Sequence, residues 1–202
     1  MALRDLLWAC PLCGTEEAIE PAGRAEACRH CGARYRRGPG ATIEARRPDG
    51  GSERAPGPAW LERLPAITVF PPPAQRRETP VRARFGAGER PVRRGGRLLG
   101  FHEVLGEAVD GTLILEPGRL TFRSAGGERH AWPFDALTAI QPSSSTVQVK
   151  ARGEAVVSFR FPATSARFWE ELLQEALRLW YRERCRGEIR EFQPRIVVGP
   201  AA

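Results

Sequence analysis

The sequence predicts a mainly β protein with one long C-terminal α-helix, organised as a small N-terminal module followed by a larger domain. Three observations support this: two cysteine pairs between residues 10 and 31, alternating apolar and polar residues between 112 and 161, and apolar residues at helical spacing between 165 and 186. The chain has 202 residues, of which 42% are hydrophobic. This length and composition allow one ordinary domain with its own core and one small module.

The N-terminal module is defined by four cysteines. Two CxxC pairs are separated by 14 residues, and a glycine, Gly14 or Gly32, directly follows each pair. Glycine favours the left-handed backbone that turns the main chain back toward the two sulfurs. Four thiolates suit tetrahedral zinc and leave no open position for water or substrate. We therefore expect a structural zinc ion held by Cys10, Cys13, Cys28 and Cys31.

Disulfide, redox and iron chemistry remain possible for the same cysteines. Disulfides suit an oxidising compartment, whereas residues 1–10 show no secretory signal and we expect a cytoplasmic protein. A thioredoxin-like redox CxxC needs a flanking strand–helix unit, which these flanks lack. Iron also binds four thiolates, although rubredoxin-type pairs usually lie further apart in sequence.

Short strands are expected around the cysteines. Residues 18–20 and 24–27 flank a turn at 21–23, and residues 34–36 supply a third strand. With its cysteine pairs, this segment resembles the zinc ribbons found across bacterial proteins, over about residues 7–37, and we assign residues 1–37 to it. The resemblance implies a module that binds DNA, RNA or protein, or that braces a neighbouring domain.

Residues 38–97 are rich in proline, glycine and arginine, and we expect a linker there. Its two short apolar segments, 60–65 and 67–70, are expected to dock on the following domain, and recognition of a partner is the alternative. Residues 71–100 contain eight arginines and only two glutamates. A solvated linker extended by self-repulsion accounts for this charge, and contact with a polyanion is the alternative. The candidate polyanion contacts are Arg76, Arg77, Arg82, Arg84, Arg93, Arg94 and Arg97.

Residues 98–187 are predicted to form consecutive strands followed by the helix. We expect a hairpin over 112–123 around Pro117 and Gly118, further strands over 130–134, 137–140, 146–150 and 156–161, and the helix over 165–186. Apolar residues recur every three or four positions in the helix and form one broad buried face. Residues 188–202 are expected to form a tail that adds a strand or returns along the domain, and a tail that binds a partner is the alternative.

Segments 111–115, 119–122 and 132–140, together with the final helix, resemble the pleckstrin-homology superfold, and more specifically a GRAM-like module. The resemblance implies a bent-sheet barrel capped by the helix, which binds phosphoinositides, lipid head groups or peptides without catalysis. The loop of the hairpin at 112–123 contains no cluster of basic residues, so specific recognition of a lipid head group is not expected.

The function that we expect is non-catalytic. The sequence has no GxxxxGK[ST] motif, no GxGxxG motif after a strand and no nucleophile-elbow sequence. We predict a zinc-binding adaptor whose C-terminal domain binds a protein partner or an anionic membrane surface, at the inner face of the membrane. One alternative is an accessory subunit of an enzyme, such as a lipid-processing one. The other is a nucleic-acid-binding protein that uses Arg29, Arg34, Arg36, Arg37 and the basic linker.

Overall fold

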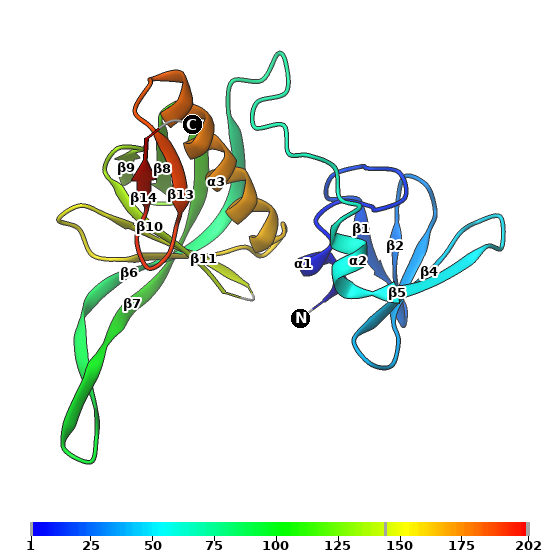
Figure 1. Cartoon of the computed structure of the whole chain (residues 1–202), viewed down its shortest axis with the longest axis horizontal. Helices are drawn as coiled ribbons and strands as arrows, with labels where there is room; N and C mark the ends of the chain where they lie inside the picture. Colours follow the sequence, from blue (N-terminus) through cyan, green and yellow to red (C-terminus); the bar gives the residue numbers. More distant parts are fainter. Residues whose placement is uncertain (1, 144, 201–202) are drawn as a thin grey trace. The chain divides into compact units, whose positions relative to one another are not determined.

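The computed structural model describes residues 2–143 and 145–200 and shows a mainly β chain with one long C-terminal helix, as predicted (Figure 1). The chain divides into two units, Met1–Ile67 and Thr68–Ala202. Each unit has its own β-sheet. Within the described residues, no helix is long and apolar enough to span a bilayer.

The first unit is a five-stranded antiparallel sheet whose strands lie in sequence order. Buried and exposed residues alternate along its strands, which places Tyr35, Ile43 and Ala45 on the face that packs with Leu7 and Trp60 in one apolar core. The opposite face is exposed to solvent. The elements of this unit are α1 (Leu3–Leu6), β1 (Ile19–Ala22), β2 (Ala25–Cys28), β3 (Arg34–Arg37), β4 (Thr42–Arg46), β5 (Ser52–Pro56) and α2 (Gly57–Leu61).

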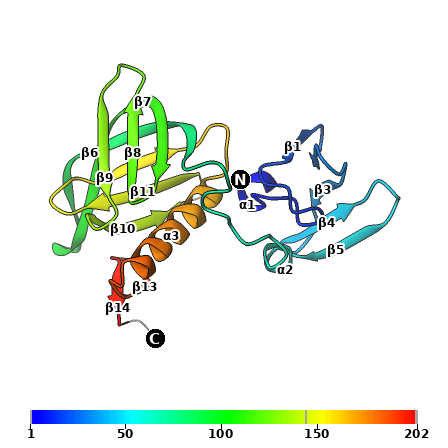
Figure 2. The ribbon, with the colours of Figure 1, turned by 90° about the horizontal axis from the view of Figure 1, so that it is seen from above.

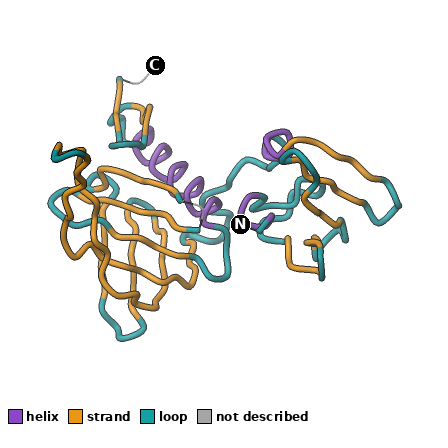
Figure 3. Tube along the Cα trace, turned by 90° about the horizontal axis from the view of Figure 1, so that it is seen from below, coloured by secondary structure: helices purple, strands orange, loops and turns teal. Residues whose placement is uncertain are grey.

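The range 38–97, for which we expected a linker, contains regular structure. Strands β4 and β5 extend the ribbon sheet beyond residue 37, and the tryptophan of the first apolar segment lies in the core of the first unit, not on the C-terminal domain. The indole Nε1 of Trp60 donates a hydrogen bond to the Ile43 carbonyl at 2.9 Å. Frequent proline and glycine conceal the period-two pattern of these short strands. Residues 62–76, between α2 and the next strand, form neither helix nor strand (Figure 3).

The second unit is built on a seven-stranded antiparallel sheet with the order β10-β11-β12-β6-β7-β8-β9 (Figure 2). The first strand, β6, pairs with both its successor β7 and the last strand of the sheet, β12. The strands are β6 (Arg77–Arg94), β7 (Arg97–Glu116), β8 (Arg119–Ser124), β9 (Arg129–Pro133), β10 (Leu137–Pro142), β11 (Thr146–Ala151) and β12 (Val157–Arg160).

The sheet of the second unit is open, so the expected bent-sheet barrel is not closed. Strands β9 and β10 are its two edges, although they follow one another in sequence. The connection between β9 and β10 explains why these two strands do not pair. Pro133, at the end of β9, has no amide hydrogen to donate to a neighbouring strand. The amide of the next residue, Phe134, donates instead to the Gly118 carbonyl at 2.9 Å. The chain therefore turns away from β9 before β10 begins.

The long helix α3 (Ala166–Glu183) begins one residue after Ser165, whose side-chain oxygen accepts a hydrogen bond from the Phe168 amide at 3.3 Å. It lies against β10 and β11 (Figure 2). The predicted range of 165–186 is longer at both ends, because Ser165 is the N-cap and residues 184–185 form the turn that follows the helix. The buried face consists of Ala166, Phe168, Trp169, Leu172, Leu173, Ala176, Leu177 and Trp180.

The C-terminal tail forms the two-stranded sheet of β13 (Glu188–Glu191) and β14 (Val197–Gly199). It also returns along the edge strand β10. The Ile140 amide donates to the Phe192 carbonyl at 3.4 Å, and the Ile196 amide donates to the Thr138 carbonyl at 2.6 Å. The tail therefore covers one edge of the large sheet.

The hairpin predicted over residues 112–123 is present, because the end of β7 pairs with β8, but a longer hairpin formed by β6 and β7 precedes it. The Gly86 amide still donates to the Val156 carbonyl at 2.7 Å, but from Gly88 to Val104 the strand ladders of the described residues join β6 and β7 only to each other. This part projects as a long two-stranded arm, green in Figure 1. Register shifts at Gly86 and Gly88 mark the place where the arm leaves the sheet. The expected boundaries at 97 and 98 therefore fall near the tip of this arm.

Candidate metal centre and basic surfaces

The four cysteines of the first unit come together as predicted. The Sγ atoms of Cys10 and Cys31 are 3.6 Å apart, those of Cys13 and Cys28 are 3.7 Å apart, and all four lie within 4.8 Å of one another. A tetrahedral ion with sulfur at about 2.3 Å has sulfur–sulfur edges of about 3.8 Å. All four thiols are free, and the distances exceed the roughly 2.05 Å of a disulfide. The cluster is compatible with a metal site such as zinc.

Two matching backbone turns position the sulfurs. The amide of Gly14 donates to the Cys10 carbonyl at 2.8 Å, and the amide of Gly32 donates to the Cys28 carbonyl at 2.9 Å. Both glycines have positive φ, 72° and 73°. A side chain would strain this left-handed conformation, so glycine is required where it follows each pair.

The sulfurs differ in their surroundings. Cys10 and Cys28 are buried, Cys31 is partly buried, and Cys13 is exposed. Burial raises the pKa of the Cys10 and Cys31 thiols. For Cys13, burial acts in the same direction, but hydrogen bonds with Thr15 and with the neighbouring thiols outweigh it and lower the pKa to about 6. Several buried thiolates repel one another, and a divalent cation among them removes this obstacle to ionisation.

The cluster is attached to the apolar core. The hydroxyl of Tyr35, on β3, lies 3.0 Å from the Cys10 Sγ, and both residues are fully buried. The ring of Trp60 packs edge-on against Tyr35 with ring centroids 6.2 Å apart. His30 lies in the second cysteine pair but is not among the residues that the described structure gathers at the site. A group bound by the sulfurs would therefore link both cysteine turns to the sheet.

The structure divides the seven predicted polyanion contacts into two sets. Four lie at or near the body of the second unit, and each makes bonds within it. Arg82 Nε donates to Asp110 Oδ1 at 2.7 Å, and Arg84 Nε donates to the Gly106 carbonyl at 2.8 Å. Arg77 donates to the carbonyls of Thr68 and Val69, and Arg76 lies 3.5 Å from Glu78. These four arginines are therefore already engaged.

The other three predicted contacts, Arg93, Arg94 and Arg97, lie at the tip of the arm, which we define as residues 90–99. Arg93 donates to the nearby Gly96 carbonyl at 3.2 Å, and within the described chain none of the three forms an ion pair. Exposed apolar side chains accompany them: Leu98 is 43% exposed and Leu99 is 59% exposed. The sequence did not reveal that these leucines are exposed, because they look like the buried start of the C-terminal domain.

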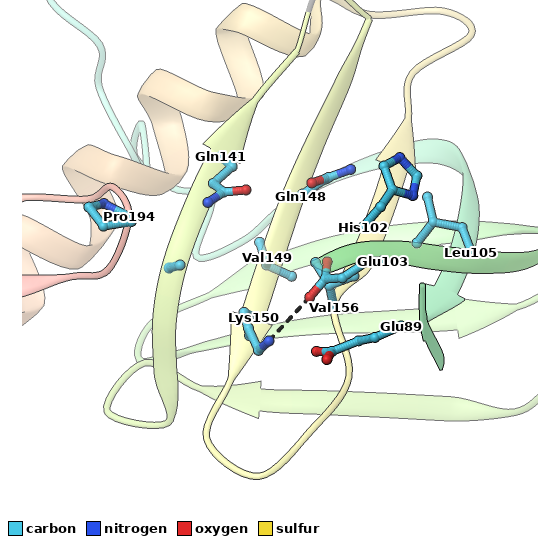
Figure 4. Close-up of a pocket in the computed structure, with 11 residues that line it drawn as sticks. Glu89, His102, Glu103, Leu105, Gln141, Gln148, Val149, Lys150, Val156 and Pro194 are labelled. Atoms are coloured by element: carbon cyan, nitrogen blue, oxygen red, sulfur yellow. Dashed lines mark hydrogen bonds and ion pairs between the residues drawn. The ribbon is translucent and has the colours of Figure 1, made fainter. Parts of the chain in front are cut away.

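A cavity of about 460 Å³ lies where the arm joins the sheet (Figure 4). Lys150 on β11, the only lysine in the chain, forms an ion pair with Glu103 of the arm at 3.1 Å. Glu103 is also the cross-strand partner of Glu89. The ion pair therefore connects the base of the arm to the half of the sheet formed by β10 and β11. The cavity is lined by Glu89, His102, Glu103, Leu105, Ala139, Gln141, Gln148, Val149, Lys150, Val156 and Pro194.

Comparison with known proteins adds no assignment to this geometry. No protein-family model, no curated protein and no solved structure matches the chain.

Proposed function

We propose that this chain is a non-catalytic adaptor, in which a structural zinc ion holds the first unit and a PH/GRAM-like second unit binds an anionic membrane surface. The observation that carries the proposal is the arm tip, where arginines without a carboxylate partner in the described chain occur together with exposed apolar side chains. We place the protein in the cytoplasm, peripherally attached to the inner face of the membrane. A protein partner would then be recruited to the membrane by the first unit.

The arrangement of the sulfurs supports zinc in the first unit. Four soft thiolates in a near-tetrahedral cluster fill every position around the ion, so zinc would have a structural role here. Cys10, Cys13, Cys28 and Cys31 would hold it. A unit of this size gains much of its folding free energy from such an ion.

The order of the strands supports the PH/GRAM-like interpretation of the second unit. A seven-stranded antiparallel sheet in which the first and last strands pair, followed by one amphipathic helix packed on the sheet, agrees with the resemblance seen in the sequence. The first hairpin of this sheet is the arm formed by β6 and β7. The loop of the hairpin at 112–123 has no cluster of basic residues, whereas the loop of the arm has one at residues 93–97. A basic first hairpin favours contact with anionic lipid.

Two forces would hold the arm tip on an anionic bilayer. Each arginine near such a surface contributes about 1 kcal/mol at ordinary ionic strength. Leu98 and Leu99 are each about half exposed, and transfer of this remaining apolar surface into the interface contributes about 1 kcal/mol for each leucine. Neither force suffices alone, but together they favour stable association with the membrane.

A nucleic-acid duplex is the second candidate for the arm tip, since a two-stranded β-ribbon fits the major groove. The exposed leucines distinguish the two candidates. In a bilayer interface the two leucines would leave water, which favours binding, whereas beside a phosphate backbone they would remain exposed to water and contribute nothing. The leucines therefore favour the membrane. An accessory subunit of a lipid-processing enzyme would use the same membrane contact and differs only in its partner.

Vesicle co-sedimentation tests the proposal. The zinc-loaded protein should bind vesicles containing phosphatidylglycerol, should ignore pure phosphatidylcholine, and should release as salt rises. Replacing Arg93, Arg94 and Arg97 by Gln, or Leu98 and Leu99 by Ser, should reduce the bound fraction at least tenfold. The matched control is Arg82→Gln, because Arg82 is already paired with Asp110.

Three results would overturn the membrane assignment: equal binding to neutral vesicles, no effect of the tip substitutions, or tight salt-sensitive binding to duplex DNA without any vesicle binding.

A further inference from the structure

The exposed face of the first unit's sheet carries two neighbouring rows of side chains. In the first row, β3, β4 and β5 contribute Arg36, Glu44 and Arg54 as cross-strand neighbours. Both arginines donate to Glu44 Oε2 at 3.0 Å. Their hydrogen bonds, from Arg54 first and then from Arg36, lower the pKa of the Glu44 carboxyl. This row therefore holds two guanidinium groups around one carboxylate.

The second row has no carboxylate on β3, β4 or β5, and its one carboxylate further along, Glu20 on β1, pairs with Arg29. Here Arg34 on β3 lies directly opposite Arg46 on β4, and the next neighbour on β5 is Ser52. Like charges directly opposite each other on adjacent strands destabilise a sheet. Arg34 Nη2 reaches only the Ala22 carbonyl, at 3.3 Å, and in the part of the chain that the structure describes neither arginine forms an ion pair. The residue on the middle strand, β4, is Glu44 in the first row and Arg46 in the second.

Several carboxylates of the first unit are engaged elsewhere. Glu26 accepts hydrogen bonds from the amides of Leu3 and Arg4, both at 2.6 Å. Glu53 pairs with Arg63 at 2.6 Å, and Glu20 pairs with Arg29 at 3.1 Å. The first unit has ten arginines and nine acidic residues in its sequence, so its net charge is small. The charges are nevertheless unevenly placed, and Glu20, Glu26 and Glu53 supply no counter-ion to the row of Arg34 and Arg46.

A cavity of about 410 Å³ lies at this row. It brings together Arg34, Arg46 and Arg47 with the paired Arg36 and Glu44. The connection between β4 and β5 lies beside it, where a side chain at Gly32 would meet Pro48 at 3.2 Å. The small residues Gly32 and Ala25 also line the cavity, and neither fills it with a long side chain.

We propose that this cavity binds a phosphate group, which supplies the second row with the negative charge that Glu44 supplies to the first. Guanidinium groups form paired, charge-assisted hydrogen bonds with phosphate oxygens, and three of them can surround one phosphate. The group can come from free phosphate or from the phosphodiester backbone of a nucleic acid. The proposal concerns only the first unit and does not rest on membrane binding by the second.

Calorimetric titration with inorganic phosphate tests the proposal, at constant ionic strength and with sodium chloride as the blank. The full zinc-loaded chain is used with Arg93, Arg94 and Arg97 replaced by Gln, so that the arm tip does not contribute. Saturable binding is expected. Arg46→Glu should abolish it or weaken it at least tenfold, because this substitution supplies an internal carboxylate. Arg54→Gln, in the row that contains Glu44, is the matched control and should change the affinity less than threefold.

Two further measurements complete the test. Arg46→Glu should raise the thermal midpoint of the first unit by a few degrees in phosphate-free buffer, because it relieves repulsion, and the phosphate-induced rise of the parent should vanish. A titration with oligothymidylate identifies where the bound phosphate group comes from. If the oligonucleotide binds more tightly than free phosphate and is equally sensitive to Arg46→Glu, the ligand is a nucleic-acid backbone. If only free phosphate binds, the ligand is the free ion. Absence of binding to both probes, or equal losses in Arg46→Glu and Arg54→Gln, would overturn the proposal.

Discussion

The hydroxyl of Tyr35 lies 3.0 Å from the Sγ of Cys10, so the apolar core of the first unit contacts its cysteine cluster directly. Tyr35 is otherwise surrounded by apolar residues, including Ile43 and Trp60. A buried hydroxyl needs a partner, and the sulfur supplies it. This contact would make the strength of the proposed zinc binding depend on a residue that is not a ligand.

Tyr35→Phe should therefore weaken zinc binding while the unit stays folded. Loss of a hydrogen bond to a ligand sulfur typically costs about tenfold or more in metal affinity. Competition with a chromophoric chelator measures this affinity. Tyr181→Phe, which changes the tyrosine of the second unit, is the matched control and should leave the zinc affinity unchanged. Equal affinities of Tyr35→Phe and the parent would contradict a role for this contact.

Removal of the metal should unfold the first unit alone. Elemental analysis should find about one zinc per chain, and Cys13→Ser or Cys31→Ser should lose it, whereas Cys185→Ser in the second unit should not. After chelation, hydrogen exchange should show that amides of β1–β5 lose protection while those of α3 keep it. A chain that retains protection in β1–β5 without metal would show that the ion is not structural.

Gly111→Ala should destabilise the second unit. A Cβ at this position would meet the Arg123 carbonyl oxygen and would lie 2.6 Å from the Cζ of Phe122, which is fully buried. Overpacking of this kind costs about 1–3 kcal/mol. Urea unfolding followed by tryptophan fluorescence should show the loss in free energy of unfolding. Gly126→Ala has its nearest contact at 3.7 Å and should behave like the parent.

Acid should weaken the second unit through Glu116. Hydrogen bonding from Arg119, at 2.7 Å, lowers the pKa of this carboxyl from its usual 4.5. A pKa that is lower in the folded state contributes stability above the unfolded value, and this contribution is lost as pH falls through the folded value. Glu116→Gln should thus be less stable than the parent at pH 7, by less than about 1 kcal/mol for this largely surface pair.

The difference between Glu116→Gln and the parent should shrink as pH falls below 4.5 and should disappear once the carboxyl is protonated in both the folded and the unfolded state. Denaturant unfolding at a series of pH values checks this. In an Arg119→Gln background the same substitution should have a much smaller effect at pH 7, which completes a double-mutant cycle. If the loss of stability caused by Glu116→Gln does not change with pH, the substitution acts through packing and not through the charge of the carboxylate.

Local patterns in the sequence predicted the features that depend on neighbouring residues. The cysteine turns were predictable because residues three apart and one glycine define each of them. Helix α3 was predictable because its apolar period and its Ser165 cap lie within one continuous segment. The turn at Pro117 and Gly118 was predictable for the same reason, whereas the long strand β6 was hidden by its prolines and glycines.

The sequence by itself determined a four-cysteine cluster, a mainly β chain and one C-terminal helix, because short-range spacing encodes all three. Only the tertiary structure decided which strands pair, since register depends on partners far apart in the chain. Pairing of β6 with β7 turned an expected linker into an arm and placed its arginines beside Leu98 and Leu99. In the first unit, pairing of β3 with β4 set Arg34 against Arg46, a repulsion between distant residues that no local pattern contains.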